Sequence, residues 1–222
     1  MKLTRRLDAI TGWIDRERVA DIGTDHGLVP FFLWEKGCPK VIATDISAPS
    51  LNKSRELCRN TDVEFRLGNG LQVLVVDEVD AVIVAGMGGI LMVELLEAAK
   101  EVVKALDFLI LQPMQASEQL RAYLYSAYRI LDEKIVYEDG RYFEMMKVTY
   151  TGEPTTVDAI DYLLPKVALL RGDGDALAFL DHLIEKKRGI VTQIGDTDSG
   201  RERKATLQHE IERLEAWTRQ NL

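Results

Sequence analysis

The residues best suited to do chemistry lie in one short stretch, Asp21-Ile22-Gly23-Thr24-Asp25-His26-Gly27. Gly23 and Gly27 lack a Cβ, so a ligand can approach the backbone closely there. The peptide N–H groups that follow such a turn point outward and need a partner. The stretch therefore predicts a ligand site where a strand turns into a helix, and the alternative is an ordinary strand–turn–helix corner.

The form of this glycine motif indicates the charge of its ligand. A dinucleotide fingerprint has the spacing G-x-G-x-x-G, and a pyrophosphate lies against it. Here Asp25 takes the place of the second glycine, and its carboxylate would repel a pyrophosphate. S-adenosylmethionine carries a sulfonium and an α-ammonium group, so it fits a corner that contains Asp21 and Asp25. An NAD-dependent enzyme is correspondingly disfavoured.

Polar residues and glycines also follow later strand-like runs. Asp45 comes about 20 residues after the corner, where an acid hydrogen-bonds ribose hydroxyls, although a helix N-cap is the alternative. Asn69 can pair with an adenine edge or form an ordinary Asn-Gly turn. Gly86-Met87-Gly88-Gly89 offer bare backbone to a ligand, with Met87 as a flexible apolar wall. Gln112 either reads a base or holds a loop.

These residues meet only if parallel strands bring their carboxyl ends to one edge. Apolar runs predict strands at 18–21, 40–45, 63–67, 79–85 and 107–111, and helices at 3–15, 28–36, 50–60, 90–106 and 116–127. This alternation predicts an α/β fold with a mostly parallel, doubly wound sheet. Two β-rich runs, 129–137 and 141–150, flank an Asp-Gly step and predict an antiparallel hairpin edge.

The composition changes at 151–156, which predicts a linker between a domain of residues 1–153 and one of residues 157–222. Apolar stripes at helical spacing after Val157 predict an antiparallel coiled-coil hairpin. Two basic clusters flank its turn: Lys186, Lys187 and Arg188, then Arg201, Arg203 and Lys204. They form either solvated helix faces or contacts with a phosphate backbone, and the same two interpretations apply to Arg5 and Arg6.

Composition excludes several other classes of protein. The formal net charge of −8 argues against a generic nucleic-acid coat but leaves room for a local basic face. Cys38 and Cys58 have no Cys or His at ligand spacing, so neither a disulfide framework nor a metal site is expected. No apolar leader segment begins the sequence, and the longest apolar run is too short to span a bilayer. We expect a soluble, cytoplasmic protein with no membrane contact.

Three motifs in this order and spacing resemble the bacterial tRNA (adenine-22-N1)-methyltransferases, the TrmK family. They are Asp21 to His26, Ala85 to Gly89, and Leu109 to Pro113; Arg5 to Ile10 also resembles the family's opening helix. The resemblance covers most of residues 1–150 and, more loosely, the helical tail. It implies a Rossmann-like class I methyltransferase domain, a C-terminal coiled-coil domain, S-adenosylmethionine as donor and tRNA as substrate. We expect a monomer or weak homodimer.

The resemblance also implies roles for individual residues. The cofactor site would comprise Asp21, Gly23, Thr24, Asp25, Gly27, Asp45, Ile46, Asn69, Gly70, Gly86, Met87 and Gly88. The resemblance implies a tRNA substrate, and the residues that we predict to contact it, from their charge, are Arg5, Arg6 and the two basic clusters. Two departures stand out: Gly27 to Pro30 replaces a bulkier continuation, and Met114 stands where the family commonly has Asn. If that Asn holds the adenine, this chain needs a substitute.

The predicted reaction places adenine N1 in line with the donor methyl, since N1 already carries an in-plane lone pair. Asp25 is the candidate stabiliser of the cationic base, with His26 or Gln112 orienting it. We count Asp25 and Gln112 as the catalytic residues. No Asn/Asp-Pro-Pro-Tyr/Phe segment follows the fourth strand, which favours a ring nitrogen over the exocyclic amine. The alternatives are a small-molecule methyltransferase with a helical dimerisation arm and a non-catalytic S-adenosylmethionine-binding module.

Overall fold

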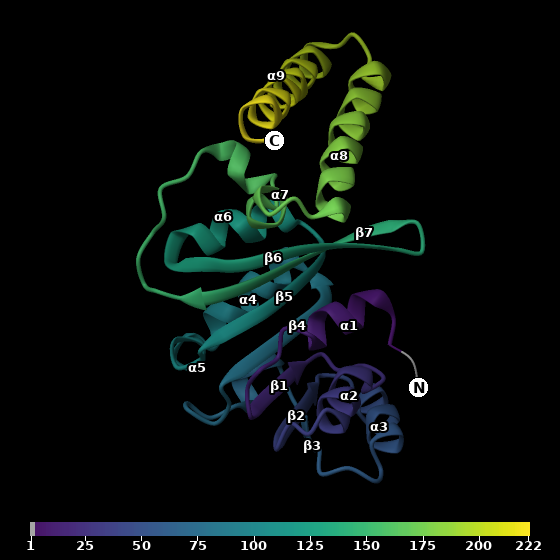
Figure 1. Cartoon of the computed structure of the whole chain (residues 1–222), viewed down its shortest axis with the longest axis vertical. Coiled ribbons are helices and arrows are strands. Elements are labelled where there is room, and N and C mark those ends of the chain that lie inside the picture. Colours follow the sequence, from purple (N-terminus) through teal and green to yellow (C-terminus); the bar gives the residue numbers. More distant parts are fainter. Residues whose placement is uncertain (1–2) are drawn as a thin grey trace.

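The computed structural model describes residues 3–222, which contain a seven-stranded sheet in the order β3-β2-β1-β4-β5-β7-β6 (Figure 1). The first five strands are parallel: β1 (Arg18–Ile22), β2 (Lys40–Asp45), β3 (Glu64–Leu67), β4 (Ala81–Gly88) and β5 (Phe108–Gln115). The last two, β6 (Tyr128–Glu138) and β7 (Arg141–Tyr150), form an antiparallel hairpin on β5. The predicted Rossmann-like sheet is confirmed.

Helices cover both faces of this sheet, because alternate residues of its buried strands point to opposite sides. Val19 and Ile83 pack toward α1 (Arg5–Thr11), α2 (Leu28–Glu35) and α3 (Ala48–Leu57). Ala20 and Val82 pack toward α4 (Gly89–Ala98), α5 (Lys100–Lys104) and α6 (Ser117–Ala127). A short 3₁₀ helix, η1 (Gly70–Val73), precedes β4. Two apolar cores therefore sandwich the sheet.

The strand order reverses at β1, which lies between β2 and β4. Connections leave β1 and β4 toward opposite sides there, so a crevice opens at their carboxyl ends. The glycine corner follows β1 and the Gly86-Met87-Gly88 segment ends β4, so both predicted ligand motifs lie at this crevice.

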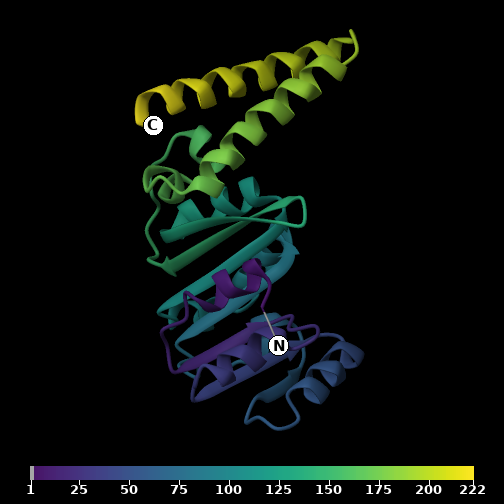
Figure 2. The ribbon, with the colours of Figure 1, turned by 45° about the vertical axis from the view of Figure 1, so that its right-hand side comes forward.

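The hairpin and the C-terminal helices form the other half of the molecule. Asp139 and Gly140 have φ values of 49° and 76°, as the predicted two-residue turn requires. After η2 (Ala159–Tyr162) and α7 (Lys166–Leu170), helices α8 (Gly174–Gln193) and α9 (Asp198–Asn221) fold back on each other (Figure 2). A third core joins these helices to Ile135 of β6, and no helix of the described residues is long and apolar enough to cross a membrane. The proposed division into two domains stays a prediction.

A buried ion cluster ties α6 to the hairpin. Arg121 Nε lies 3.0 Å from Glu133 Oε1, and Arg121 Nη1 lies 2.7 Å from Glu144 Oε2. Arg121 and Glu133 are both 1% exposed, and burial raises the pKa of Glu133. The peptide N–H of Val167, at the start of α7, donates to Glu133 Oε2 over 3.0 Å. The cluster thus connects the sheet with the helical tail.

Four predicted elements differ clearly from the structure in their bounds. The strands predicted at 79–85 and 107–111 continue to Gly88 and Gln115. The single helix predicted at 90–106 is two, α4 and α5, because Ala99 leaves the helical region with φ −130°. The first helix spans only Arg5–Thr11, where the Thr4 hydroxyl accepts the peptide N–H of Leu7 and Gly12 follows the end.

Candidate active site

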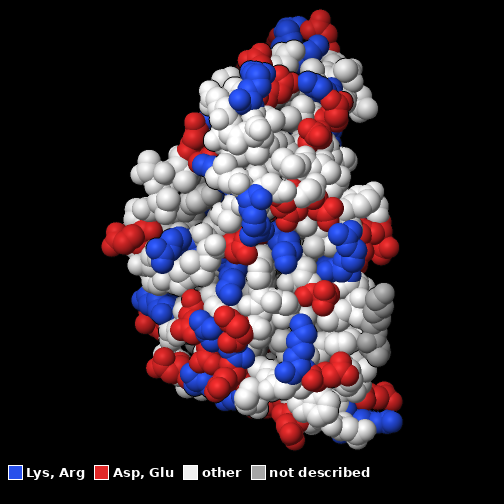
Figure 3. Space-filling model, viewed as in Figure 1, with Lys and Arg blue, Asp and Glu red and all other residues white. Residues whose placement is uncertain are grey.

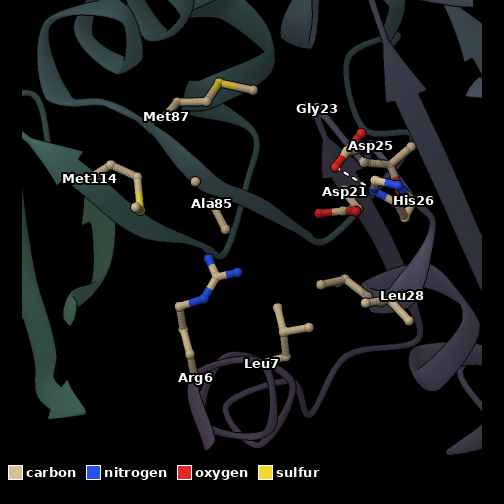
Figure 4. Close-up of a pocket in the computed structure, with 13 residues that line it drawn as sticks. Arg6, Leu7, Asp21, Gly23, Asp25, His26, Leu28, Ala85, Met87 and Met114 are labelled. Carbon is tan, nitrogen blue, oxygen red and sulfur yellow. Dashed lines mark hydrogen bonds and ion pairs between the residues drawn. The ribbon is translucent and has the colours of Figure 1, made fainter. Parts of the chain in front are cut away.

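A cleft of about 440 Å³ lies at the carboxyl ends of β1 and β4 (Figure 4). Its wall comes from α1, the β1–α2 corner, the start of α2, and the ends of β4 and β5. The lining residues are Arg6, Leu7, Asp21, Gly23, Thr24, Asp25, His26, Leu28, Val29, Ala85, Gly86, Met87 and Met114. Of the predicted cofactor residues, the structure thus brings together Asp21, Gly23, Thr24, Asp25, Gly86 and Met87.

The β1–α2 corner is held rigidly by the neighbouring strand β2. The peptide N–H groups of Gly23 and Thr24 both donate to the Thr44 carbonyl, over 2.8 and 2.9 Å. Gly23 has φ 74°, and a Cβ there would lie 2.1 Å from Met87 Cε. A side chain at position 23 would therefore strain the backbone and displace Met87, so the glycine lets the two cleft walls approach each other.

Asp45 supports this corner rather than lining the cleft. Its Oδ2 accepts the peptide N–H of Asp25 over 3.1 Å, and its Oδ1 accepts that of Ser47 over 2.8 Å. Each oxygen keeps a free lone pair, because a carboxylate oxygen accepts two hydrogen bonds. The predicted ribose contact of Asp45 stays a prediction.

Asp21 is a buried acid at the base of the cleft. Only 4% of the residue is exposed, and burial raises the pKa of its carboxyl to about 7, with nearby Asp45 adding to the rise. No cation of the described residues forms an ion pair with it. A cationic ligand would supply the missing partner and favour the ionised carboxylate.

Asp25 and His26 lie at the mouth of the same corner. Asp25 has φ 49°, and its Oδ2 lies 2.6 Å from His26 Nδ1 (Figure 4). Both side chains are exposed, at 63% and 60%. His26 thus orients the Asp25 carboxylate, as one of the two predicted orienters, and the carboxylate remains accessible to a second partner.

Gln112, counted as catalytic because it was predicted to orient Asp25, lies behind the cleft, and its hydrogen bonds go to other residues. The residue is 0% exposed. Its Oε1 accepts from Arg6 Nη1 over 2.7 Å and from the Gly86 peptide N–H over 3.2 Å, while its Nε2 donates to the Pro113 carbonyl. Gln112 is therefore a positioning residue that aims Arg6 into the cleft, which agrees with the loop-holding alternative.

Six other predicted cofactor residues lie outside the cleft lining. They are Gly27, Asp45, Ile46, Asn69, Gly70 and Gly88. A Cβ on Gly27 would lie 2.9 Å from Ser54 Cα, and one on Gly70 would lie 2.5 Å from Leu95 Cδ2, so these glycines serve helix packing. Ile46 is 73% exposed, and the Asn69 side chain caps no peptide group of η1. A role for them in cofactor binding stays a prediction.

The sequence interpretation missed the apolar part of the lining. Leu7, Leu28, Val29 and Ala85 were assigned to helix faces or a buried strand. The only available signal was position, since Leu28 and Val29 directly follow the glycine corner. Met114 was noted as a departure from the family pattern, and it lies in the cleft beside Met87 with 46% exposure.

The basic residues predicted to contact tRNA are partly neutralised within the chain. Arg5 pairs with Asp175, Lys187 with Glu210, Arg188 with Glu185 and Glu215, and Arg201 with Asp196 and Asp198. Lys186, Arg203 and Lys204 are exposed and form no ion pair with the described residues. Positive and negative side chains alternate on the face shown in Figure 3. The predicted tRNA contacts stay a prediction.

Residues 3–222 contain no group of three His, Cys, Asp or Glu side chains placed to hold a metal ion. Cys38 and Cys58 are free, and burial raises the pKa of both thiols. Neither cysteine lines the cleft.

Comparisons with known proteins agree with this geometry. A family model for a methyltransferase domain matches residues 3–146. A curated Bacillus subtilis (strain 168) protein named tRNA (adenine(22)-N(1))-methyltransferase is 35% identical over 153 residues, which are 66% of this chain and 64% of that relative. The chain thus matches slightly less than two thirds of that relative's length.

Solved structures resemble the whole chain, including its helical tail. The B. subtilis m1A22 tRNA methyltransferase TrmK is 26% identical with a TM-score of 0.85, covering 97% of this chain and 98% of that one. An uncharacterised Listeria monocytogenes serotype 4b protein is 26% identical with a TM-score of 0.89, covering 97% and 99%. M. capricolum TrmK with S-adenosyl-homocysteine shares the fold at 20% identity, TM-score 0.83 and 98% coverage of both chains. The resemblance inferred from the three motifs is confirmed.

Proposed function

The chain belongs to the methyltransferase domain family, and from this premise we propose that it transfers a methyl group from S-adenosylmethionine to N1 of adenine 22 in tRNA. The observation that carries the proposal is the single cleft at the β1 and β4 ends, which joins a buried acid to an apolar wall. The B. subtilis relative, named for this reaction, supports the choice of substrate.

The cleft fits S-adenosylmethionine in its charge and its backbone. Asp21 is buried without a cationic partner among the described residues, and the donor carries positive charge. The buried hydroxyl of Thr24 lies in the cleft lining close to the Asp21 carboxyl, so both groups are available to a polar ligand atom. Gly86 has φ 79° and only Arg6 within 4 Å of a built Cβ, so its backbone faces the open cleft.

Methyl transfer to adenine N1 is mainly a positioning task for this chain. When bound, S-adenosylmethionine supplies an electrophilic methyl group on a sulfonium. N1 attacks with its own lone pair, so no residue has to remove a proton. Asp25, oriented by His26, stabilises the positive charge that develops on the base. Because adenine 22 lies within folded RNA, it must be exposed before it enters the cleft.

The remaining cleft residues fit the acceptor base. Arg6, Leu7 and Met114 line the side opposite Asp21 and Asp25 (Figure 4). Gln112 fixes the Arg6 guanidinium over 2.7 Å, so Arg6 presents its other N–H groups in a set direction. Met87 and Met114 are flexible apolar side chains that adapt to a flat ring. We propose that this side holds adenine in line with the donor.

The test is incubation of the protein with unmodified bulk tRNA and labelled S-adenosylmethionine, followed by nucleoside analysis. The expected product is 1-methyladenosine, mapped to position 22. Another methylated nucleoside would overturn the proposed target. Methylation of small molecules without RNA would favour the alternative, a small-molecule methyltransferase whose helical tail serves dimerisation. Tight binding of the donor with no product on any RNA would favour a non-catalytic binding module.

Further parts of the proposal concern the whole protein. We propose a division into a methyltransferase domain of residues 1–153 and a helical domain of residues 157–222. The protein would act in the cytoplasm as a monomer or weak homodimer. Sedimentation across a range of concentrations tests the oligomeric state, and fractionation of cells tests the location.

A further inference from the structure

A row of aromatic rings, exposed at both ends and half-buried in the middle, lies on the hairpin tip and the first half of α8, near the cleft. It consists of Tyr137, Tyr142 and His182, which we name the aromatic patch. We infer that the aromatic patch stacks against unpaired bases of the RNA strand that flanks the target adenine. This inference deepens the proposed function and rests on it, since it locates where the RNA substrate is held.

The rings of the patch form a continuous row. Tyr137 and Tyr142 are cross-strand partners on β6 and β7, with ring centroids 4.7 Å apart. The centroid of His182 on α8 lies 5.3 Å from that of Tyr142. Side-chain packing of the hairpin against α8 accounts for Tyr142, which also contacts Phe179 and the third core. It does not account for Tyr137, which is 43% exposed, or for His182, which is also exposed.

Two hydrogen bonds between α1 and the hairpin, each joining a side chain to a main-chain group, fix the patch relative to the cleft. Arg5 Nη1 donates to the Tyr137 carbonyl over 2.7 Å. The next residue, Arg6, donates its peptide N–H to Glu138 Oε2 over 2.8 Å and lines the cleft with its side chain. An RNA strand whose adenine enters beside Arg6 therefore meets the hairpin tip directly.

The cleft lining itself has few groups that could stack against the bases next to the target adenine. No Phe, Tyr or Trp stands among the described residues that line the cleft. The one aromatic ring in that lining is the imidazole of His26, which is paired with Asp25 at the mouth, so the cleft offers bases beside the target no large stacking surface. Bases in single-stranded RNA are commonly held by stacking on aromatic rings, at about 1–3 kcal/mol per base, which corresponds to about 5- to 150-fold in affinity.

Charge around the patch also favours stacking over simple phosphate attraction. Arg141 and Lys186 are exposed at its two ends and form no ion pair with the described residues. Asp139 and Asp181 are exposed beside them, and the chain carries a net charge of −8. A continuous basic field is also missing from the face in Figure 3. Most of the local affinity for RNA must then come from contacts with bases.

The test compares ring-removing and ring-keeping variants of the full chain. Fluorescence anisotropy with unmodified tRNA transcript, in the presence of S-adenosylhomocysteine, gives the dissociation constant of each. We expect Tyr137→Leu and His182→Leu to weaken tRNA binding about tenfold each. Tyr137→Phe should bind as the wild type does, because it keeps the ring. His209→Leu, at an exposed histidine of α9, is the matched control and should also leave binding unchanged.

Other measurements separate the possible failures. Calorimetry with S-adenosylhomocysteine should be unaltered in every variant, since none of these residues lines the cleft. Thermal unfolding should show that every variant is folded at the temperature of the binding assay. If the wild type makes 1-methyladenosine in tRNA but Tyr137→Leu and His182→Leu bind tRNA unchanged, the patch inference alone is overturned. If the wild type makes no such product, the proposed function is overturned with it. A homodimer that dissociates in Tyr137→Leu would assign the patch to a second protein chain and overturn the inference.

Discussion

At the scale of single residues, the site combines an acid that is buried with one that is accessible. Asp21 is 4% exposed at the base of the cleft, whereas the Asp25 side chain is 63% exposed at its mouth. Burial penalises the charged form of a carboxyl group, so the two acids respond differently to pH and to a bound cation. Each therefore yields its own prediction.

Asp21 predicts that binding of S-adenosylmethionine depends on pH. Burial raises the pKa of Asp21 to about 7, so at pH 6 the free protein holds mostly the neutral acid, which a cation does not favour. We expect affinity to fall about tenfold from pH 8 to pH 6 because binding then requires loss of the proton. Calorimetry in buffers of different ionisation enthalpy should detect the released proton.

Asp21→Asn is the control for this pH dependence. It should bind weakly at both pH values and release no proton.

In the ligand-free protein, the pKa of Asp21 in the folded state lies above its unfolded value of 3.8, so ionisation of Asp21 lowers the free energy of unfolding. The stability that neutral Asp21 contributes is fully present below pH 4 and is lost as pH rises through 7. Asp21→Asn should therefore raise the Tm at pH 8, and a lower Tm there would contradict the assignment.

Substitution of Asp25 should reduce turnover on tRNA and leave cofactor binding almost unchanged. Its backbone has φ 49°, a region that Asn adopts more readily than Ala, so Asp25→Asn removes the charge with the least strain on the corner. We expect Asp25→Asn to lower kcat on tRNA by at least tenfold, with less than a threefold change in the affinity for S-adenosylhomocysteine. Single-turnover kinetics measure the first quantity. Full turnover in both Asp25→Asn and Asp25→Ala would remove Asp25 from the mechanism.

At the scale of elements, the sequence predicted regular strands well and irregular ones poorly. The strand at Lys40–Asp45 and the one at Arg141–Tyr150 have the predicted bounds, because apolar character and an Asp-Gly turn define them locally. β4 continues through Gly86 and Gly88 because β5 pairs with it beyond the glycines, with two register shifts. Strand propensities disfavour glycine, and they take no account of pairing with a neighbouring strand such as β5.

The same limit explains the placement of the site residues. The glycine corner and Asp21 were predictable, since their motif is local. The burial of Gln112 was not, because it depends on Arg6, which is 106 residues distant in sequence. Likewise, the sequence does not distinguish a glycine that faces a ligand from a glycine that allows a helix to pack closely. Gly27 is of the second kind because Ser54 of α3 lies against it, whereas Gly23 faces Met87 in the cleft.

Gly27 therefore predicts an effect on packing. Its φ is 76°, and a Cβ would lie 2.9 Å from the Ser54 main chain, so Gly27→Ala should destabilise the protein by about 2–4 kcal/mol. Gly37→Ala is the matched control, because Gly37 has φ 86° with nothing within 4 Å of a built Cβ. It should cost only the backbone strain, about 1 kcal/mol. Denaturant unfolding measures both, and equal losses would contradict the packing role.

At the scale of the whole molecule, the tail and the sheet share interior residues. Ile135 of β6 lies in the third core, and Glu133 accepts hydrogen bonds or ion pairs from both α6 and α7. Contacts of this kind make separate melting of the two proposed domains unfavourable. The tail is thus built onto the sheet, and its position relative to the cleft is fixed by buried residues.

Arg121 provides the test of this coupling. Arg121→Met leaves Glu133 buried without its cation, so we expect a loss of about 3–5 kcal/mol in the free energy of unfolding. Adding Glu133→Gln removes the uncompensated charge and should restore part of that loss. Unfolding followed by near-UV circular dichroism and by the fluorescence of Trp13, Trp34 and Trp217 together should give one transition in the wild type. Two transitions in the wild type would indicate independent domains.

The edge strand β6 is exposed during synthesis until the C-terminal helices cover it. β6 is one of the two edge strands of the sheet, and Arg171, just after α7, donates to the main-chain carbonyl of Glu133 over 2.8 Å. During synthesis the hairpin leaves the ribosome before its helical cover, and for that interval an unprotected strand is available for pairing with a neighbouring nascent chain. Proteins of this build should accordingly be prone to fibrous association when translation stops early, and released polypeptides ending near residue 153 should be found in the insoluble fraction.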